Sequence, residues 1–106
     1  MTGKVKLYKV VKVDGKETKE LEFNFENLPS NAISRATTFL NQQRYAVANP
    51  AMDIELHNLI FGIAAGLALG DAYNLHPKDK MATAMQSVLF FNDTSEDSST
   101  ENNSEE

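Results

Sequence analysis

His57 and His76 are the side chains best suited to acid–base or metal chemistry near neutral pH, since the sequence contains no cysteine. Asp53 lies four residues before His57, which places the pair on one helix face but makes a metal site only if further ligands join it. Zinc-protease, serine-hydrolase and phosphate-loop motifs are absent from the sequence. We therefore expect a surface ion pair between Asp53 and His57, and a protein without catalytic residues, cofactor or metal.

Three glycines recur every four residues in the most apolar segment, LIFGIAAGLALG (59–70), at Gly62, Gly66 and Gly70. Eleven consecutive apolar residues cover the whole circumference of a helix, so this segment cannot be a surface helix with one wet face. A glycine inside a helix costs about 1 kcal/mol relative to alanine, and often marks close approach of another backbone. Two interpretations remain open: a central core helix, or a helix whose Gly62/Gly66 face contacts another chain.

Large apolar side chains gather near the end of the sequence, where Met81 and Met85 are four residues apart and Phe90 and Phe91 follow. Core packing would explain the methionine pair, but methionine also suits adaptable binding surfaces because it is flexible and polarisable. Phe90 and Phe91 are adjacent and cannot both face the same core. One of them is therefore expected to be exposed, and Phe91 joins Met81 and Met85 among the candidate contact residues.

A β-hairpin is predicted to precede the helices that carry these residues. Residues 4–13 and 20–26 read as strands, and Asp14-Gly15 between them is a turn signal. A two-residue loop would pair odd positions with even ones and put the two apolar faces on opposite sides, whereas an odd-numbered loop or a bulge would reunite them. We therefore predict a wider turn within residues 14–18. The apolar faces are Val5, Leu7, Val11 and Val13 on one strand, and Leu21, Phe23 and Phe25 on the other.

Three helices are predicted after the hairpin, which makes the chain an α+β protein with one domain over residues 1–91. The first helix begins near Ser30 and ends between residues 44 and 48, and the second runs from a cap at Asn49 to about residue 69. Gly70 is the expected stop of the second helix, and the third begins after Pro77. The expected core stripes are Ile33, Ala36, Thr37 and Leu40 in the first helix, and Met81, Ala84, Met85 and Val88 in the third.

Charge is unevenly distributed along the chain, whose formal net charge is −5. Residues 92–106 contain six acids, no base and no apolar side chain, so they are predicted to be a disordered acidic tail. The six hairpin lysines are nearly offset by five acids within residues 1–26, which argues against a nucleic-acid-binding face. The apolar segment of eleven residues is short of the roughly 20 that span a membrane, so we expect no membrane association.

The order of these features resembles the small tail assembly chaperones of long-tailed bacteriophages and prophages. The resemblance covers residues 5–91 and rests on ELEFNFENLPSNAI (20–33), the Asn49-Pro50 helix start, LIFGIAAGLAL (59–69), the Leu75-x-Pro77-x-Asp79 junction and the final VLFF (88–91). It implies a non-enzymatic protein of the host bacterial cytoplasm that is absent from the finished virion. Such a protein coats the long, helical tape measure protein and helps to recruit tail tube subunits.

What the resemblance implies for this chain is an oligomer whose copies present apolar helix faces to the tape measure protein. The candidate contact residues are Gly62, Gly66, Met81, Met85 and Phe91. Many family members also exist in a longer, frameshifted form, to which an acidic tail could be a linker. The alternative is a self-assembling structural subunit of a phage tail or head–tail junction. A small nucleic-acid-binding regulator is a third reading, and it lacks the basic face that it would need.

Overall fold

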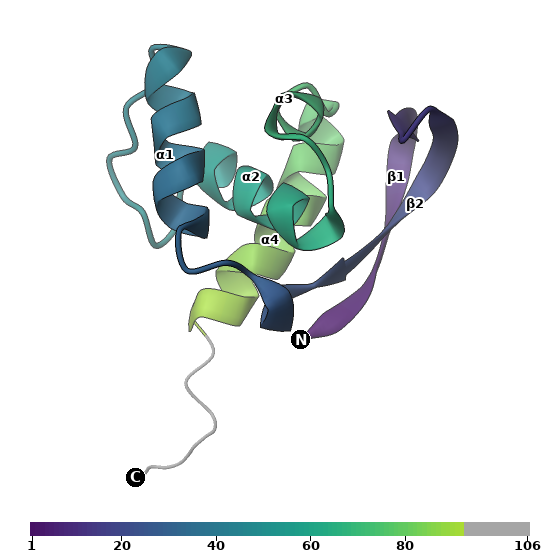
Figure 1. Cartoon of the computed structure of the whole chain (residues 1–106), viewed down its shortest axis with the longest axis horizontal. Coiled ribbons are helices and arrows are strands. Elements are labelled where there is room, and N and C mark those ends of the chain that lie inside the picture. The colour runs from purple at the N-terminus through teal and green to yellow at the C-terminus, as the bar shows by residue number, and fades with distance from the viewer. Residues whose placement is uncertain (93–106) are drawn as a thin grey trace, which may run out of the picture.

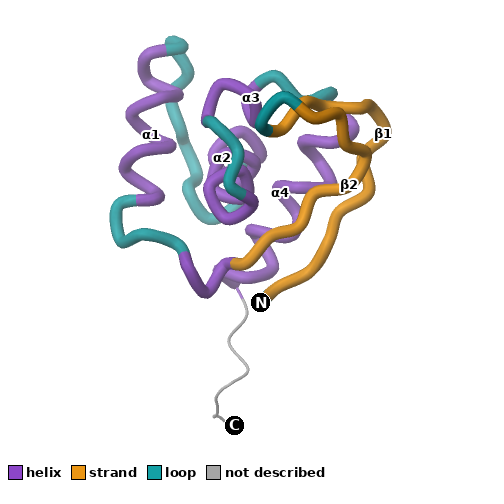
Figure 2. The backbone as a smooth tube through the Cα atoms, turned by 45° about the vertical axis from the view of Figure 1, so that its right-hand side comes forward, coloured by secondary structure: helices purple, strands orange, loops and turns teal. Residues whose placement is uncertain are grey.

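The computed structural model describes residues 1–92, in which a β-hairpin is followed by helices, so the predicted α+β class is confirmed. The strands and helices are β1 (Thr2–Val13), β2 (Lys16–Asn24), the 3₁₀ turn η1 (Phe25–Asn27), α1 (Ala32–Gln42), α2 (Ile54–Ala65), α3 (Leu69–Tyr73) and α4 (Pro77–Asn92). Helix α2 lies between α1 on one side and the hairpin on the other (Figures 1 and 2). The predicted acidic tail lies outside the described residues, except for Asn92, which is the last residue of α4.

A tight two-residue turn joins the strands, so the wider turn predicted within residues 14–18 is wrong. Asp14 and Gly15 both have positive φ angles, 52° and 81°, and Val13 pairs directly with Lys16. Two positive φ angles match the twist of a hairpin, and aspartate followed by glycine is the sequence that tolerates them. The register must therefore be corrected elsewhere in the hairpin.

A bulge in β1 makes that correction. Lys6 pairs with Glu20 and Val11 pairs with Thr18, so Leu7–Val10 lie opposite the single residue between those two partners. The irregularity puts the first half of β1 in phase with β2, so that Val5 pairs with Leu21, whereas Val13 beside the turn still pairs with Lys16. As a result Val5, Leu7, Leu21 and Phe23 are buried together in the core, where β2 packs on α2 and β1 packs on α4.

Helix α4 holds the bulge in place through one buried carboxylate. Asp79 Oδ1 accepts a hydrogen bond from the Tyr8 amide (2.7 Å), and its Oδ2 accepts one from the Lys9 amide (3.1 Å). These amides belong to the bulge, where β2 offers no regular ladder partner. Asp79 thus provides the missing acceptor for these amides from about 70 residues away in the sequence. This contact attaches the hairpin to the start of α4.

The second predicted helix is shorter at both ends than the expected span of residues 49–69. Asp53, rather than Asn49, caps α2, because its carboxylate accepts from the Leu56 amide at 2.9 Å. Gly66 ends the helix with a φ of 80°, and the amides of Gly66 and Leu67 bond back to the carbonyls of Ile63 and Gly62. This pair of bonds is a Schellman motif, in which glycine is favoured because its φ is positive.

The core forms where the hairpin and α1 pack on α2. The rings of Phe23 and Phe61 are 5.0 Å apart, and Leu40 of α1 is fully buried. Ile33 was expected in the core but is 47% exposed, because the buried stripe of α1 is Ala32, Ala36 and Leu40. Within residues 1–92, no helix combines the length and the apolar character needed to cross a bilayer.

Candidate protein-binding surfaces

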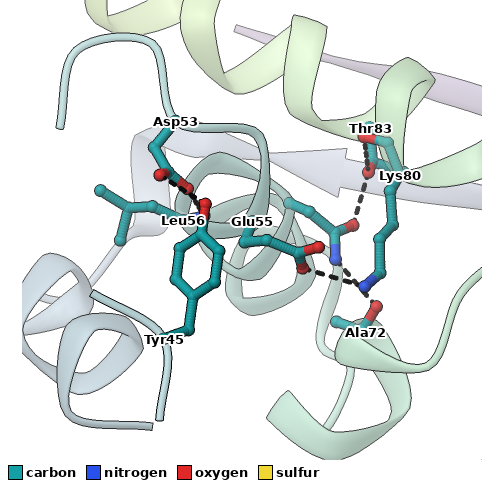
Figure 3. A network of polar contacts seen from close by, with 8 residues as sticks. Tyr45, Asp53, Glu55, Leu56, Ala72, Lys80 and Thr83 are labelled. Carbon is teal, nitrogen blue, oxygen red and sulfur yellow. Dashed lines mark hydrogen bonds and ion pairs between the residues drawn. The ribbon is translucent and has the colours of Figure 1, made fainter. Parts of the chain in front are cut away.

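His57 is a buried structural residue, so the predicted surface ion pair with Asp53 is wrong. The ring nitrogen Nε2 lies 2.8 Å from the Pro50 carbonyl, which can only accept, and Nδ1 lies 2.6 Å from Ser87 Oγ. Asp53 instead accepts a hydrogen bond from the Tyr45 hydroxyl at 2.8 Å (Figure 3), and this bond together with burial raises the pKa of Tyr45 to about 12. In residues 1–92, no three His, Asp and Glu side chains are grouped so as to hold a metal ion.

A row of polar side chains on α4 faces the protein interior, and we call it the polar seam: Asp79, Thr83 and Ser87. These residues are four apart, so they lie on one helix face. Thr83 Oγ1 donates to Asn58 Oδ1 at 2.6 Å, and Asn58 Nδ2 donates to the Ala72 carbonyl at 2.8 Å. Ser87 contacts His57, and the nearby Lys80 ammonium pairs with Glu55 at 2.9 Å (Figure 3). Every member of the seam therefore has a hydrogen-bonding partner.

Because the polar seam faces inward, the apolar side of α4 faces outward. Met81, Met85 and Leu89 are 54%, 48% and 52% exposed, and we call them the α4 stripe. Of the core stripe predicted for this helix, only Ala84 is fully buried. The core-packing interpretation of the methionine pair is thus wrong. Turning α4 to bury the stripe would separate the seam from its partners and leave polar groups unsatisfied in the interior.

A second apolar surface, the terminal groove, lies where the start of α1 meets the end of α4. It consists of two adjacent hollows with volumes of about 210 and 250 Å³, and Ile33 and Phe91 line both of them. Other apolar residues around the groove are Pro50, Leu56 and Ile60 in one hollow, and Phe25, Leu28 and Phe90 in the other.

The two adjacent phenylalanines separate as expected, with one held in the protein and one at the surface. Phe90 stacks on Phe25 with ring centroids 4.9 Å apart and an interplanar angle of 11°. Phe91 is 41% exposed and meets the His57 ring edge-on at 5.8 Å. Its ring thus lies at the rim of the groove, against His57 and Phe90.

Gly62 faces its own chain, which matches the interpretation of its helix as a core helix. A Cβ atom on Gly62 would lie 2.7 Å from the Cβ of Ala72 in α3, so the glycine permits α2 and α3 to touch. Gly66 is exposed but ends the helix, and Gly70 belongs to α3. The three glycines therefore do not form one helix face, and Gly62 is inaccessible to another chain.

The glycine contact leads to a stability prediction. Gly62→Ala is expected to lower the free energy of unfolding by about 1–3 kcal/mol, because the new methyl must push α3 away from α2. Gly70→Ala is the matched control, since nothing lies within 4 Å of its Cβ position and its φ is not in the left-handed region. Denaturant unfolding of both variants checks this; equal stabilities would show that α3 shifts without cost.

The structure brings Ile33 and Phe91 together in the terminal groove, and it aligns Met81 and Met85 on the α4 stripe. No family model, curated protein or solved structure matches this chain. Both surfaces can bind apolar side chains. Helix α4 contributes to both, and it carries no charged residue from Met81 to Asn92. Sequence reasoning missed Ile33 as a surface residue, and it placed Met81 and Met85 on the inward side of α4.

Proposed function

We propose that this chain is a non-enzymatic tail assembly chaperone of a long-tailed phage or prophage, working in the host bacterial cytoplasm. It binds the tape measure protein and helps to recruit tail tube subunits to it. The observation that carries the proposal is the terminal groove, a concave apolar surface in the folded protein with Ile33 and Phe91 at both hollows. The sequence resemblance over residues 5–91 supplies the class of partner.

The shape of the groove suits an amphipathic helix. Large side chains four residues apart on a helix are neighbours on one face, with Cβ atoms about 5–6 Å apart. Two adjacent hollows that share Ile33 and Phe91 can each take one such side chain from the same partner helix. Docking of an apolar helix face into an apolar groove is a common mode of peptide recognition.

Covering apolar side chains explains how the protein would act as a chaperone. A long helical protein with unpartnered apolar faces associates with itself, and each bound copy of this chain removes a short stretch of those faces from water. The six acids that follow Asn92 in the sequence add the same negative charge to every bound copy. Repulsion between coated molecules then favours solubility.

Co-expression with a tape measure protein of a long-tailed phage tests the proposal. The wild-type chain is expected to keep the tape measure protein soluble, and the double variant Ile33→Ser/Phe91→Ser is expected to leave most of it in the pellet. Both side chains are about half exposed, so each substitution should lower the free energy of unfolding by about 1 kcal/mol, which leaves the protein folded. Val10→Ser is the matched control, because Val10 is similarly exposed but lies in the β1 bulge.

Two results would contradict the proposal. One is a tape measure protein that is insoluble with or without the wild-type chain, and the other is full protection by the groove variant. The alternative function is a structural subunit of a tail or head–tail junction. Mass spectrometry of purified particles distinguishes it from a chaperone. A chaperone is missing from them, whereas a structural subunit is present in many copies.

A further inference from the structure

We infer that His57 is the positioning residue of the terminal groove, because it holds in place an exposed segment that lines one of the two hollows. We call this segment the groove wall: residues 48–52, which lie between α1 and α2 and contribute Pro50 and Ala51 to the hollow of about 210 Å³. The inference deepens the proposed function and rests on it for what the groove binds.

The groove wall is not held by burial of its own side chains. Every residue from 48 to 52 is exposed, whereas the preceding Val47 packs against the core and the following Asp53 caps α2. The amides of Met52 and Asp53 both bond to the Asn49 carbonyl, which shapes the turn locally. Contacts from other elements to the remaining carbonyls are therefore what holds the turn against the groove.

Two side chains from the helices reach those carbonyls. His57 Nε2 on α2 lies 2.8 Å from the Pro50 carbonyl oxygen, and Asn92 Nδ2 at the end of α4 donates to the Ala51 carbonyl at 3.3 Å. The His57 contact is the shorter one and is partly buried, while the Asn92 contact is exposed. A hydrogen bond shielded from water is electrostatically stronger than an exposed one, so His57 provides the main attachment.

The His57 ring is itself held in one orientation. It is 2% exposed, and its Nδ1 lies 2.6 Å from Ser87 Oγ in the polar seam. Because the Pro50 carbonyl can only accept, Nε2 carries the proton, and in the neutral ring the Ser87 hydroxyl donates to Nδ1. The same ring meets Phe91 edge-on at 5.8 Å. One imidazole thus connects the groove wall, helix α2 and the Phe91 rim of the hollow.

The position of the groove wall determines whether the hollow is formed before a partner arrives. Pro50 and Ala51 line it together with Ile33 and Phe91, so a displaced wall leaves that side open to water. A partner then has to order the wall as it binds, and the apparent affinity falls with the fraction of the protein in which the wall is in place. A wall that is in place about one tenth of the time weakens binding about tenfold.

Two amide substitutions of His57 separate its bond to Pro50 from its burial. The side-chain nitrogen of glutamine reaches about as far as Nε2, whereas that of asparagine reaches only about as far as Nδ1. His57→Gln is therefore expected to keep the Pro50 bond, and His57→Asn to lose it. Ser87→Ala is the matched control, because it removes the other polar contact of the ring and leaves the Pro50 bond.

The mobility of the groove wall is the first readout. The backbone order parameters of the Ala51 and Met52 amides, measured by NMR relaxation, should fall from about 0.85 in the wild type to below about 0.6 in His57→Asn. His57→Gln and Ser87→Ala should keep values close to the wild type. Unchanged order parameters in His57→Asn would overturn the inference.

Pull-down of a tape measure protein from co-expressing cells is the second readout, which a purely structural role of His57 would not move in this pattern. Its recovery on the tagged chain should fall about tenfold with His57→Asn. Recovery should be retained with His57→Gln and with Ser87→Ala. A mobile wall combined with full recovery in His57→Asn would show that the wall does not matter for binding, and would also overturn the inference.

The proposed function and this inference can fail separately. If the wild-type chain recovers no tape measure protein, the proposed function fails, and the order parameters still decide whether His57 holds the groove wall. If His57→Asn does not fold, the imidazole of the wild type decides instead. Nitrogen NMR spectra should show a proton on Nε2, and a neutral ring with its proton on Nδ1 would overturn the inference.

Discussion

Asp79→Ala is expected to lower the free energy of unfolding by about 3 kcal/mol, because two backbone amides lose a charged acceptor at once. The carboxylate is buried and bonds the Tyr8 and Lys9 amides at 2.7 and 3.1 Å. Hydrogen bonds to charged groups contribute about 1.5–3 kcal/mol each to stability. The amides of the bulge have no regular strand partner that could replace the carboxylate. The hairpin should therefore detach from α4 more readily.

Denaturant unfolding measures this effect against two other variants. Asp79→Asn keeps one carbonyl acceptor and should lose about half as much stability as Asp79→Ala. Asp71→Ala is the matched control, because Asp71 is also an acid in the first turn of a helix but is exposed, and it should change stability by no more than about 0.5 kcal/mol. Equal stabilities of the Asp79 and Asp71 variants would show that water serves the bulge amides as well as Asp79 does.

Asn58→Leu is expected to cost about 3 kcal/mol, since this fully buried amide joins three parts of the chain. It donates to the Ala72 carbonyl in α3 and accepts from Thr83 on α4. Leucine has a similar volume but makes neither bond, so the Ala72 carbonyl keeps only backbone donors such as the Leu75 amide, and the Thr83 hydroxyl keeps only the Lys80 carbonyl. Thermal or denaturant unfolding provides the measurement.

A double-mutant cycle isolates the contact between α2 and α4. Thr83→Val removes the hydroxyl in the same volume, so the pair Asn58→Leu/Thr83→Val should cost less than the sum of the single variants, by about 0.5–3 kcal/mol. The physical reason is that a buried polar group without its partner lowers the free energy of unfolding more than two apolar groups in contact do. Strict additivity would mean that the 2.6 Å contact between Thr83 and Asn58 contributes nothing to stability.

The hairpin and the start of α4 were predictable because they depend on local chemistry. Strand alternation located Leu21 and Phe23 in the core, and Pro77 marked the first position of the last helix. The turn was predicted less well, since the register conflict could be removed either by a wider loop or by a bulge. The choice depends on Asp79, whose carboxylate accepts hydrogen bonds from the bulge amides 70 residues away. The local sequence pattern cannot show such a contact.

The faces of α4 were misassigned for a related reason. Its sequence contains an apolar row and a polar row with the same four-residue spacing, so periodicity identifies both without saying which one is buried. Burial of apolar area alone favours Met81 and Met85 inside. The partners Asn58 and His57 reverse this choice, because they are buried on α2 and need polar contacts. Only the packing of α2 against α4 reveals that requirement.

The end of α2 shows how an apolar run can hide a break. LIFGIAAGLALG (59–70) contains no polar residue to mark a stop, yet Gly66 adopts a φ of 80° and the chain turns into α3. The break allows Ala72 to pack on Gly62, so one long predicted helix becomes two short ones in contact. Of the three glycines, Gly62 therefore serves the contact between α2 and α3, whereas Gly66 ends α2 and Gly70 has no neighbour within 4 Å of its Cβ position.

The most direct test of the account is a pull-down of the tagged chain from phage-producing cells, comparing wild type with Ile33→Ser/Phe91→Ser and Val10→Ser. We expect the tape measure protein to co-purify with wild type and Val10→Ser, and its recovery to fall at least tenfold with the groove variant. A loss of about 1.4 kcal/mol in binding is enough for this difference. Equal recovery with all three proteins, or recovery of the chain alone, would contradict the groove as the binding site for the tape measure protein.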